Sequence, residues 1–66
     1  MIIYVNNKEF NFNESITILQ LIDSLNLNIK SIAAAVNKEI IPKTKYSEFI
    51  LKDKDILDLV TIAPGG

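Results

Sequence analysis

The chain has 66 residues, a hydrophobic content of 48% and a net charge of −1, which allow one domain built on one small core. It has no cysteine and no histidine, which excludes disulfides, thiolate nucleophiles, cysteine-based zinc sites and the commonest general base. The cations are all lysines without a basic face, and no apolar run approaches the ~20 residues that span a bilayer, so we expect neither nucleic acid nor a membrane as a partner.

A β-hairpin is predicted at the N-terminus. Residues 2–5 are β-branched or aromatic, and the pair Asn6-Asn7 is a turn signal. Residues 9–13 then alternate strictly, with Phe10 and Phe12 on one face. The two segments therefore pair as neighbouring strands.

A helix is expected to start at Thr17. Gln20 stands three residues later, as in a capping box, and Ile16 and Leu21 occupy the positions of a hydrophobic staple. The apolar residues at helical spacing predict one buried stripe, formed by Ile18, Leu21, Ile22 and Leu25. Asn26 is the predicted C-cap.

A second hairpin is predicted where residues 32–36 and 39–41 flank the turn Asn37-Lys38, with Pro42 ending the second strand. Its first strand contains three consecutive alanines, at positions 33–35, which have little β propensity. We therefore expect a bulky element to pack close against this strand, and the helix is the natural candidate.

The last third of the chain predicts a crossover and one more strand. Residues 43–51 indicate an irregular connection with a short helical turn and a few core anchors, which are Tyr46, Phe49, Ile50 and Leu51. After the polar turn at 52–55, residues 56–62 form the last strand, with Asp58 on the solvent side and Leu57 and Leu59 on the core side. Residues 63–66 are expected to form a free, flexible tail.

This order of elements predicts an α+β domain over residues 1–62, with a mixed sheet of four to five strands and one main helix across one face. It is typical of the β-grasp arrangement, in which the first and last strands lie side by side at the centre. The residues that alternate with the core positions then face outward together: Ile2, Tyr4, Val60 and Ile62. Such a patch indicates a partner-docking surface, although scattered surface apolars are also normal.

The only glycines, Gly65 and Gly66, end the chain directly after the last strand. A terminal carboxylate on two residues without side chains can enter a narrow active site, while the alternative interpretation is a loose tail. No side-chain catalysis is expected, because the serines have no imidazole to activate them. No metal site is expected either, because Asp53 and Asp55 in a lysine-rich turn are typical of solvated carboxylates.

Over nearly its whole length the chain resembles the ubiquitin-like sulfur carriers, and among them the thiamine-biosynthesis sulfur carrier (ThiS) family. The resemblance rests on Thr17-Ile18 and the apolar helix positions after them, Ala35-Val36-Asn37, Ile41-Pro42, Tyr46, the Asp55 turn and the Gly65-Gly66 end. It implies that the protein is not an enzyme. In that family a partner enzyme adenylates the terminal carboxylate, here that of Gly66, which then becomes a thiocarboxylate. Gly65 and Pro64 would form the neck of the tail, the narrow segment directly before the reacting residue.

The same resemblance implies the partners and the pathway. They are a ThiF-type adenylyltransferase that uses ATP, a cysteine desulfurase system that provides the sulfur, and a ThiG-type thiazole synthase that accepts it for thiazole formation. The chain itself is expected to bind no cofactor, to be a monomer when free and to act in the cytoplasm.

Two residues depart from the family pattern. The turn that the family usually writes Gly-Asp reads Lys54-Asp55 here, which predicts a turn without positive φ at that position. Pro64 stiffens the tail and removes a backbone donor, and a proline there is similar to the molybdopterin synthase small subunit, an alternative carrier. Conjugation to lysines of other proteins is a further alternative, and a non-covalent β-grasp interaction module is the alternative from a different class.

Overall fold

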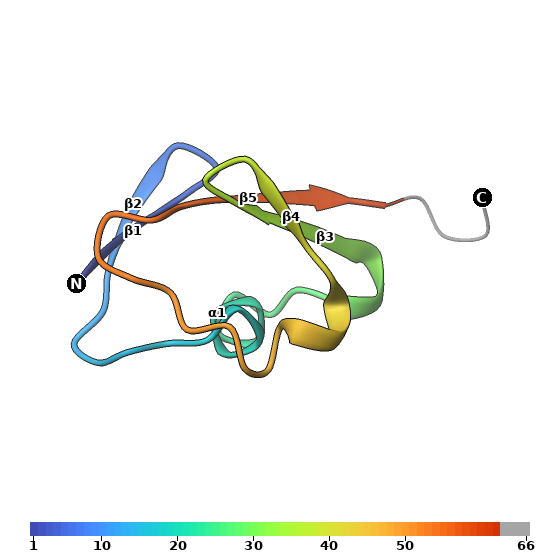
Figure 1. The fold of residues 1–66 in the computed structure, drawn as a ribbon, viewed down its shortest axis with the longest axis horizontal. Helices are drawn as coiled ribbons and strands as arrows, with labels where there is room; N and C mark the ends of the chain where they lie inside the picture. The colour runs from blue at the N-terminus through green and yellow to red at the C-terminus, as the bar shows by residue number, and fades with distance from the viewer. Residues whose placement is uncertain (63–66) are drawn as a thin grey trace.

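A computed structural model describes residues 1–62, which form a five-stranded mixed sheet with one α-helix below it (Figure 1). The elements are β1 (Ile2–Val5), β2 (Lys8–Asn11), α1 (Ile18–Ser24), η1 (Ile29–Ser31), β3 (Ile32–Val36), β4 (Glu39–Ile41), η2 (Lys43–Lys45) and β5 (Ile56–Thr61). The strand order is β2-β1-β5-β3-β4, in which only β1 and β5 run parallel. The first and last strands are therefore central neighbours, which confirms the predicted β-grasp arrangement. The tail expected at residues 63–66 lies outside the described residues.

Both predicted hairpins are present, and both turn through two residues with positive φ. The angles are 49° and 70° at Asn6 and Asn7, and 51° and 72° at Asn37 and Lys38. Two consecutive positive φ angles are typical of the type I′ turn, whose twist matches that of the strands it joins. The strand β2 ends at Asn11, before the predicted position 13.

The predicted capping box starts α1. The Thr17 hydroxyl accepts a hydrogen bond from the Gln20 N–H at 3.1 Å, and Gln20 Oε1 accepts one from the Thr17 N–H at 2.9 Å. The buried stripe is formed by Ile18, Leu21 and Ile22, with Leu25 partly buried. The C-cap is Leu25 rather than Asn26; Asn26 follows with a φ of 58°, the left-handed conformation common just beyond a helix end.

The alanines of β3 do not all face the helix, so the prediction made for them is wrong in part. Only Ala34 lies in the core, while the pleat turns Ala33 and Ala35 to the opposite face of the sheet. The group that approaches Ala34 closely is the hydroxyl of buried Tyr46, which accepts a hydrogen bond from the Ala34 N–H at 2.9 Å. A small side chain at position 34 leaves room for this contact.

The connection from β4 to β5 contains the predicted helical turn, η2, and three of its four predicted anchors. Tyr46 and Leu51 are buried and Phe49 packs against the core from its edge. Ile50 is 56% exposed and is therefore not an anchor. Its backbone instead forms an isolated antiparallel bridge with Thr17, which leaves its side chain outside the core.

Two asparagine side chains extend the pairing of β5. The ladder between β1 and β5 reaches only to Leu57. Beyond it, the Asn6 side-chain amide bonds both backbone groups of Leu59. Asn6 Oδ1 accepts a hydrogen bond from the Leu59 N–H at 2.8 Å, and Asn6 Nδ2 donates one to the Leu59 carbonyl at 3.1 Å. At the start of β5, Asn37 Oδ1 accepts from the Ile56 N–H at 3.0 Å. Both hairpin turns thus hold the last strand in place.

The turn before β5 contradicts the expectation that Lys54 needs no positive φ. The Asp55 N–H donates to the Lys52 carbonyl at 3.0 Å, which closes a four-residue turn, and Lys54 has a φ of 70°. A positive φ at the third position is the requirement of a type II turn, which favours glycine. The side chain of Lys54 therefore tolerates a conformation in which its Cβ is crowded.

We expect Lys54→Gly to raise the free energy of unfolding by about 0.5–1 kcal/mol, because glycine removes the crowding at Cβ and loses only part of that gain to its greater unfolded entropy. The matched control is Lys52→Gly in the same turn, which is not among the positive-φ residues and should destabilise the domain. Urea denaturation of the two variants measures both changes. Equal changes in the same direction would contradict the turn geometry.

Candidate functional site

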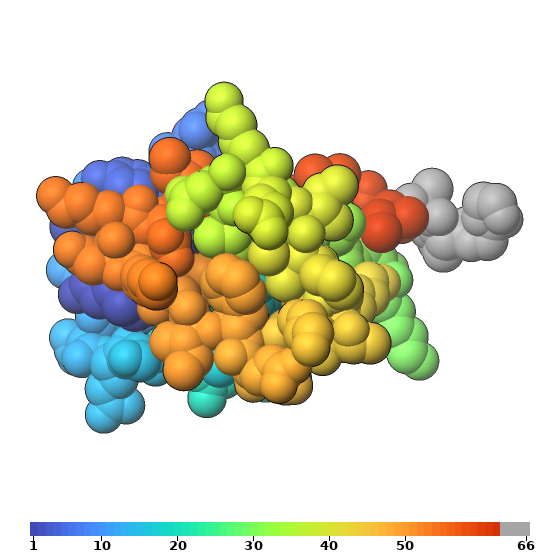
Figure 2. Space-filling view, viewed as in Figure 1, coloured from blue at the N-terminus to red at the C-terminus, as the bar shows by residue number. Residues whose placement is uncertain are grey.

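The end of β5 is held to the sheet and lies at one end of the molecule. The N–H of Ile62, one residue beyond the strand, donates to the Ser31 carbonyl at 2.7 Å. Figure 2 shows the last part of β5 in red at the surface, beside β3 in green. Ile62, the last described residue, therefore lies at the accessible surface of the domain. The predicted acyl site, Gly66, and the predicted neck, Gly65 and Pro64, lie outside the described residues.

The sheet has one face on the core and one face turned away from it, which we call the open face. Burial alternates along the central strands, so that Leu57 and Leu59 of β5 are buried while Val60 is 60% exposed. Ile62 is 45% exposed, and Ile2 and Tyr4 of β1 are partly buried at positions that alternate with the core residues. All four predicted docking residues thus lie on the open face.

The open face includes two further apolar side chains that the sequence analysis missed. Ile56 pairs with Tyr4 across the central strands and is 46% exposed, and Ile40 pairs with Ala35 and is 79% exposed. The alternation that placed Val60 would have found Ile56 as well. Ile40 lies on a strand of three residues, and its register with β3 is not visible in so short a pattern.

The carboxylates of the turn before β5 both accept hydrogen bonds from backbone N–H groups. Asp53 Oδ1 accepts a hydrogen bond from the Ile2 N–H at 2.7 Å, and Asp55 Oδ2 accepts one from the Lys52 N–H at 2.8 Å. Asp55 Oδ1 also accepts from the Asn37 amide at 3.1 Å. These contacts give both aspartates a structural role. Within residues 1–62, no group of three or more acidic, histidine or cysteine residues is placed to hold a metal ion.

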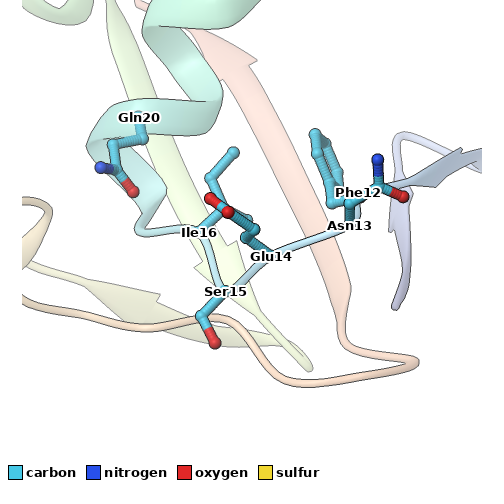
Figure 3. A pocket seen from close by; sticks show the side chains of 6 residues that line it. All are labelled: Phe12, Asn13, Glu14, Ser15, Ile16 and Gln20. Carbon is cyan, nitrogen blue, oxygen red and sulfur yellow. The ribbon is translucent and has the colours of Figure 1, made fainter.

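A surface hollow lies along the segment that leads from β2 into α1 (Figure 3). Its lining residues are Phe12, Asn13, Glu14, Ser15, Ile16 and Gln20. The Gln20 amide oxygen is used by the helix cap, and within residues 1–62 the Ser15 hydroxyl forms no hydrogen bond with the Glu14 carboxylate that lines the hollow beside it. Among the described residues that line the hollow, no hydrogen bond joins a nucleophile to a base, the arrangement that activates a hydroxyl for covalent catalysis. No helix in the described range is long and apolar enough to cross a bilayer.

Comparison with known proteins gives a consistent result. Residues 2–66 match the model of the ThiS family. A thiazole synthase of Paramagnetospirillum magneticum is 33% identical over 66 residues, and the chain spans only 20% of that relative's length. The uncharacterized protein ycf40 of Pyropia yezoensis is 31% identical over 64 residues, which are 97% of this chain and 90% of that protein.

Two solved structures show the same fold. The crystal structure of the thiamine biosynthesis protein ThiS from Geobacter metallireducens superposes with a TM-score of 0.86, at 22% identity and with both chains covered completely. A solution structure of a thiamine biosynthesis protein from the same organism gives a TM-score of 0.79 at 20% identity, and covers 100% of this chain and 88% of that one. At these identities the likeness supports the fold alone.

Proposed function

This chain belongs to the ThiS family, and from that premise we propose that it carries sulfur for thiamine biosynthesis on the carboxylate of its last residue, Gly66. The observation that carries the proposal is the extent of the family match, which runs through the strand β5 to the terminal Gly65-Gly66 pair. The absence of cysteine and histidine from the sequence leaves the terminal carboxylate as the group best suited to carry sulfur.

Loading begins by making this carboxylate a better electrophile. A carboxylate oxygen of Gly66 attacks the α-phosphorus of ATP on a ThiF-type adenylyltransferase, and pyrophosphate leaves. A desulfurase system transfers sulfur from cysteine into a persulfide, whose terminal sulfur then attacks the carbonyl carbon of the acyl-adenylate and displaces AMP. A thiol then attacks the other sulfur of the acyl persulfide, so that the thiol is oxidised to a disulfide and the acyl-bound sulfur leaves as the thiolate. The product is a thiocarboxylate. In this scheme the chain is a co-substrate, and the partner provides the nucleotide site.

The described structure supports this role through the position of β5. The strand lies between β1 and β3 and is held by both hairpin turns, so the last described residues have a fixed direction. Four residues beyond Ile62 could extend by at most roughly 13 Å at ~3.3 Å each. That length is enough to pass through the wall of an active site while the open face rests on the enzyme.

The acceptor that we propose is a ThiG-type thiazole synthase. The relative named thiazole synthase contains a region that matches the whole of this chain, while most of that relative lies outside the match. A carrier-like region within a thiazole synthase supports a functional link between the two activities. This observation favours thiazole formation over sulfur delivery to a molybdopterin precursor. The cytoplasmic location expected from the sequence stays a prediction.

Intact mass spectrometry tests the proposal. The chain is incubated with a ThiF-type adenylyltransferase, a cysteine desulfurase, cysteine and ATP, and a parallel sample receives no ATP. We expect an ATP-dependent mass change that corresponds to one oxygen replaced by one sulfur. An unchanged mass, with an adenylyltransferase that loads its own carrier under the same conditions, would contradict the proposal.

If the chain docks on the adenylyltransferase through its open face, a charge placed on that face should weaken loading. Val60→Glu should lower kcat/KM for loading by about tenfold or more, because it places a charge on an apolar contact surface. The free energy of unfolding should change by no more than about 0.5 kcal/mol, because the Val60 side chain is exposed. Tyr4→Glu should act in the same direction. The matched control is Leu27→Glu, an exposed apolar residue beside the helix side of the sheet. Equal loading by all three variants would mean that the open face is not the surface that docks on the adenylyltransferase.

A further inference from the structure

One acidic residue lies in the middle of the open face. Asp58 is the third residue of β5, the central strand of the sheet, and alternates there with Ile56 and Val60. It is partly buried, and its direct neighbour on β3 is Ala35, whose side chain is a single methyl group. The carboxylate is therefore flanked by apolar side chains on β5 and β3 that do not cover it, while the polar turn residue Asn6 follows on the β1 side.

Asp58 has no partner within the described range. No side chain or backbone group of residues 1–62 forms an ion pair or a side-chain hydrogen bond with its carboxylate, and the ion pair present there joins Lys45 to Glu48. The aspartates of the preceding turn differ, because both accept hydrogen bonds from backbone N–H groups. Asp58 thus has no identified role in holding the fold together.

The charged side chains at the strand positions of the open face have one sign. Glu9 lies opposite Tyr4 and is the other carboxylate among the outward strand positions. The strands contain one lysine, Lys8, which pairs with buried Val5 and therefore lies on the other side of the sheet. The open face consequently presents apolar side chains with two carboxylates and no cation on its strands.

Covering this face with a purely apolar partner would remove water from an unpaired carboxylate, which is strongly unfavourable. A partner that places a cationic side chain opposite Asp58 would instead form a charge-assisted hydrogen bond in an environment that excludes water. A second copy of this chain, seated face to face on the first, would bring like charges together. The observations therefore favour a partner with an apolar surface and an arginine or lysine at its centre.

We propose that Asp58 selects the activating enzyme by pairing with a cationic side chain on its docking surface. This inference rests on the proposed function, because it assigns the partner of the same carrier. The apolar residues around Asp58 provide contact area, and the carboxylate rejects apolar surfaces that lack the matching charge. Asp58 is thus a residue for partner choice and touches none of the reacting atoms.

The test uses the full chain and a ThiF-type adenylyltransferase from the same organism, with binding measured by titration calorimetry at several salt concentrations. Asp58→Asn keeps the shape of the side chain and removes its charge, so we expect its Kd to rise about 30-fold and its salt dependence to become shallower. Asp58→Glu, which keeps the charge, should retain most of the affinity. The control Asp23→Asn makes the same change on the exposed surface of α1 and should bind like the wild type.

Three results are informative. Loss of affinity by Asp58→Asn, retention by Asp58→Glu and an unchanged urea midpoint for both would support the proposal. If the wild-type chain is loaded with sulfur and Asp58→Asn binds with the same Kd and salt dependence, Asp58 has no selective role although the carrier function stands. A wild-type chain that neither binds the enzyme nor is loaded would overturn the proposed function and this inference together.

Discussion

Removing Gly66 should abolish sulfur loading while leaving the thermal unfolding midpoint nearly unchanged, and adding one residue after Gly66 should do the same. Either change moves the terminal carboxylate by roughly one residue length, ~3.3 Å, along the tail. A misplacement of about 1 Å at a reacting group can already cost on the order of a hundredfold in rate. Intact mass spectrometry after incubation with the activating enzyme and ATP measures loading, and a thermal scan measures stability.

A chain of full length with a C-terminal amide is the matched control for Gly66. It keeps every residue and every contact of the chain but lacks the carboxylate oxygen that attacks ATP, so it should also fail to load. Normal loading of the amide or of the shortened chain would assign the sulfur to another group. A large drop in the unfolding midpoint on deletion would instead give residue 66 a structural role.

Leu57→Ala should destabilise the domain by about 3–5 kcal/mol, because it removes a large side chain from a fully buried site and leaves a cavity. A domain of this length has only about 3–10 kcal/mol of stability in total. Leu57 lies on β5, opposite Val5 of β1 and Val36 of β3, so the loss affects both sides of the central strand. The midpoint of urea denaturation, followed by circular dichroism, measures the change.

Val60→Ala on the same strand is the control for Leu57→Ala. The Val60 side chain is on the open face, so its truncation should change stability by less than about 0.5 kcal/mol. The pair of variants separates the two faces of one strand, one that stabilises the core and one that is free for contact. Equal destabilisation by both would mean that the open face is covered in the free protein.

Local chemistry made much of the fold predictable. The capping box of Thr17 and Gln20 depends on residues three positions apart, and the turns at Asn6-Asn7 and Asn37-Lys38 depend on side chains that tolerate positive φ. The two faces of β5 follow from strict alternation along six residues. In each case the residues that determine the structure are close together in the sequence.

The errors arose where distant segments decide. Lys54 adopts a positive φ because the turn must bring β5 alongside β1, where the Lys54 N–H bonds the Ile2 carbonyl. Ala34 differs from its neighbours because Tyr46, twelve residues further along the chain, bonds its N–H. The surroundings of Asp58 also depend on several strands at once, since its lack of an ion pair within residues 1–62 appears only when the sheet is assembled. A single sequence contains no local signal for these contacts.

In the proposed loading reaction the Gly66 carboxylate attacks ATP to form an acyl-adenylate, and sulfur then displaces AMP, which takes one of the two carboxylate oxygens with it. The most direct measurement labels that carboxylate with heavy oxygen, by hydrolysing a C-terminal thioester of the full chain in labelled water, and then determines the mass of the AMP released during loading. Because the attacking oxygen stays on phosphorus when sulfur displaces AMP at the carbonyl carbon, we expect AMP that contains the heavy oxygen. Release of unlabelled AMP alone, or sulfur loading without any AMP, would contradict it.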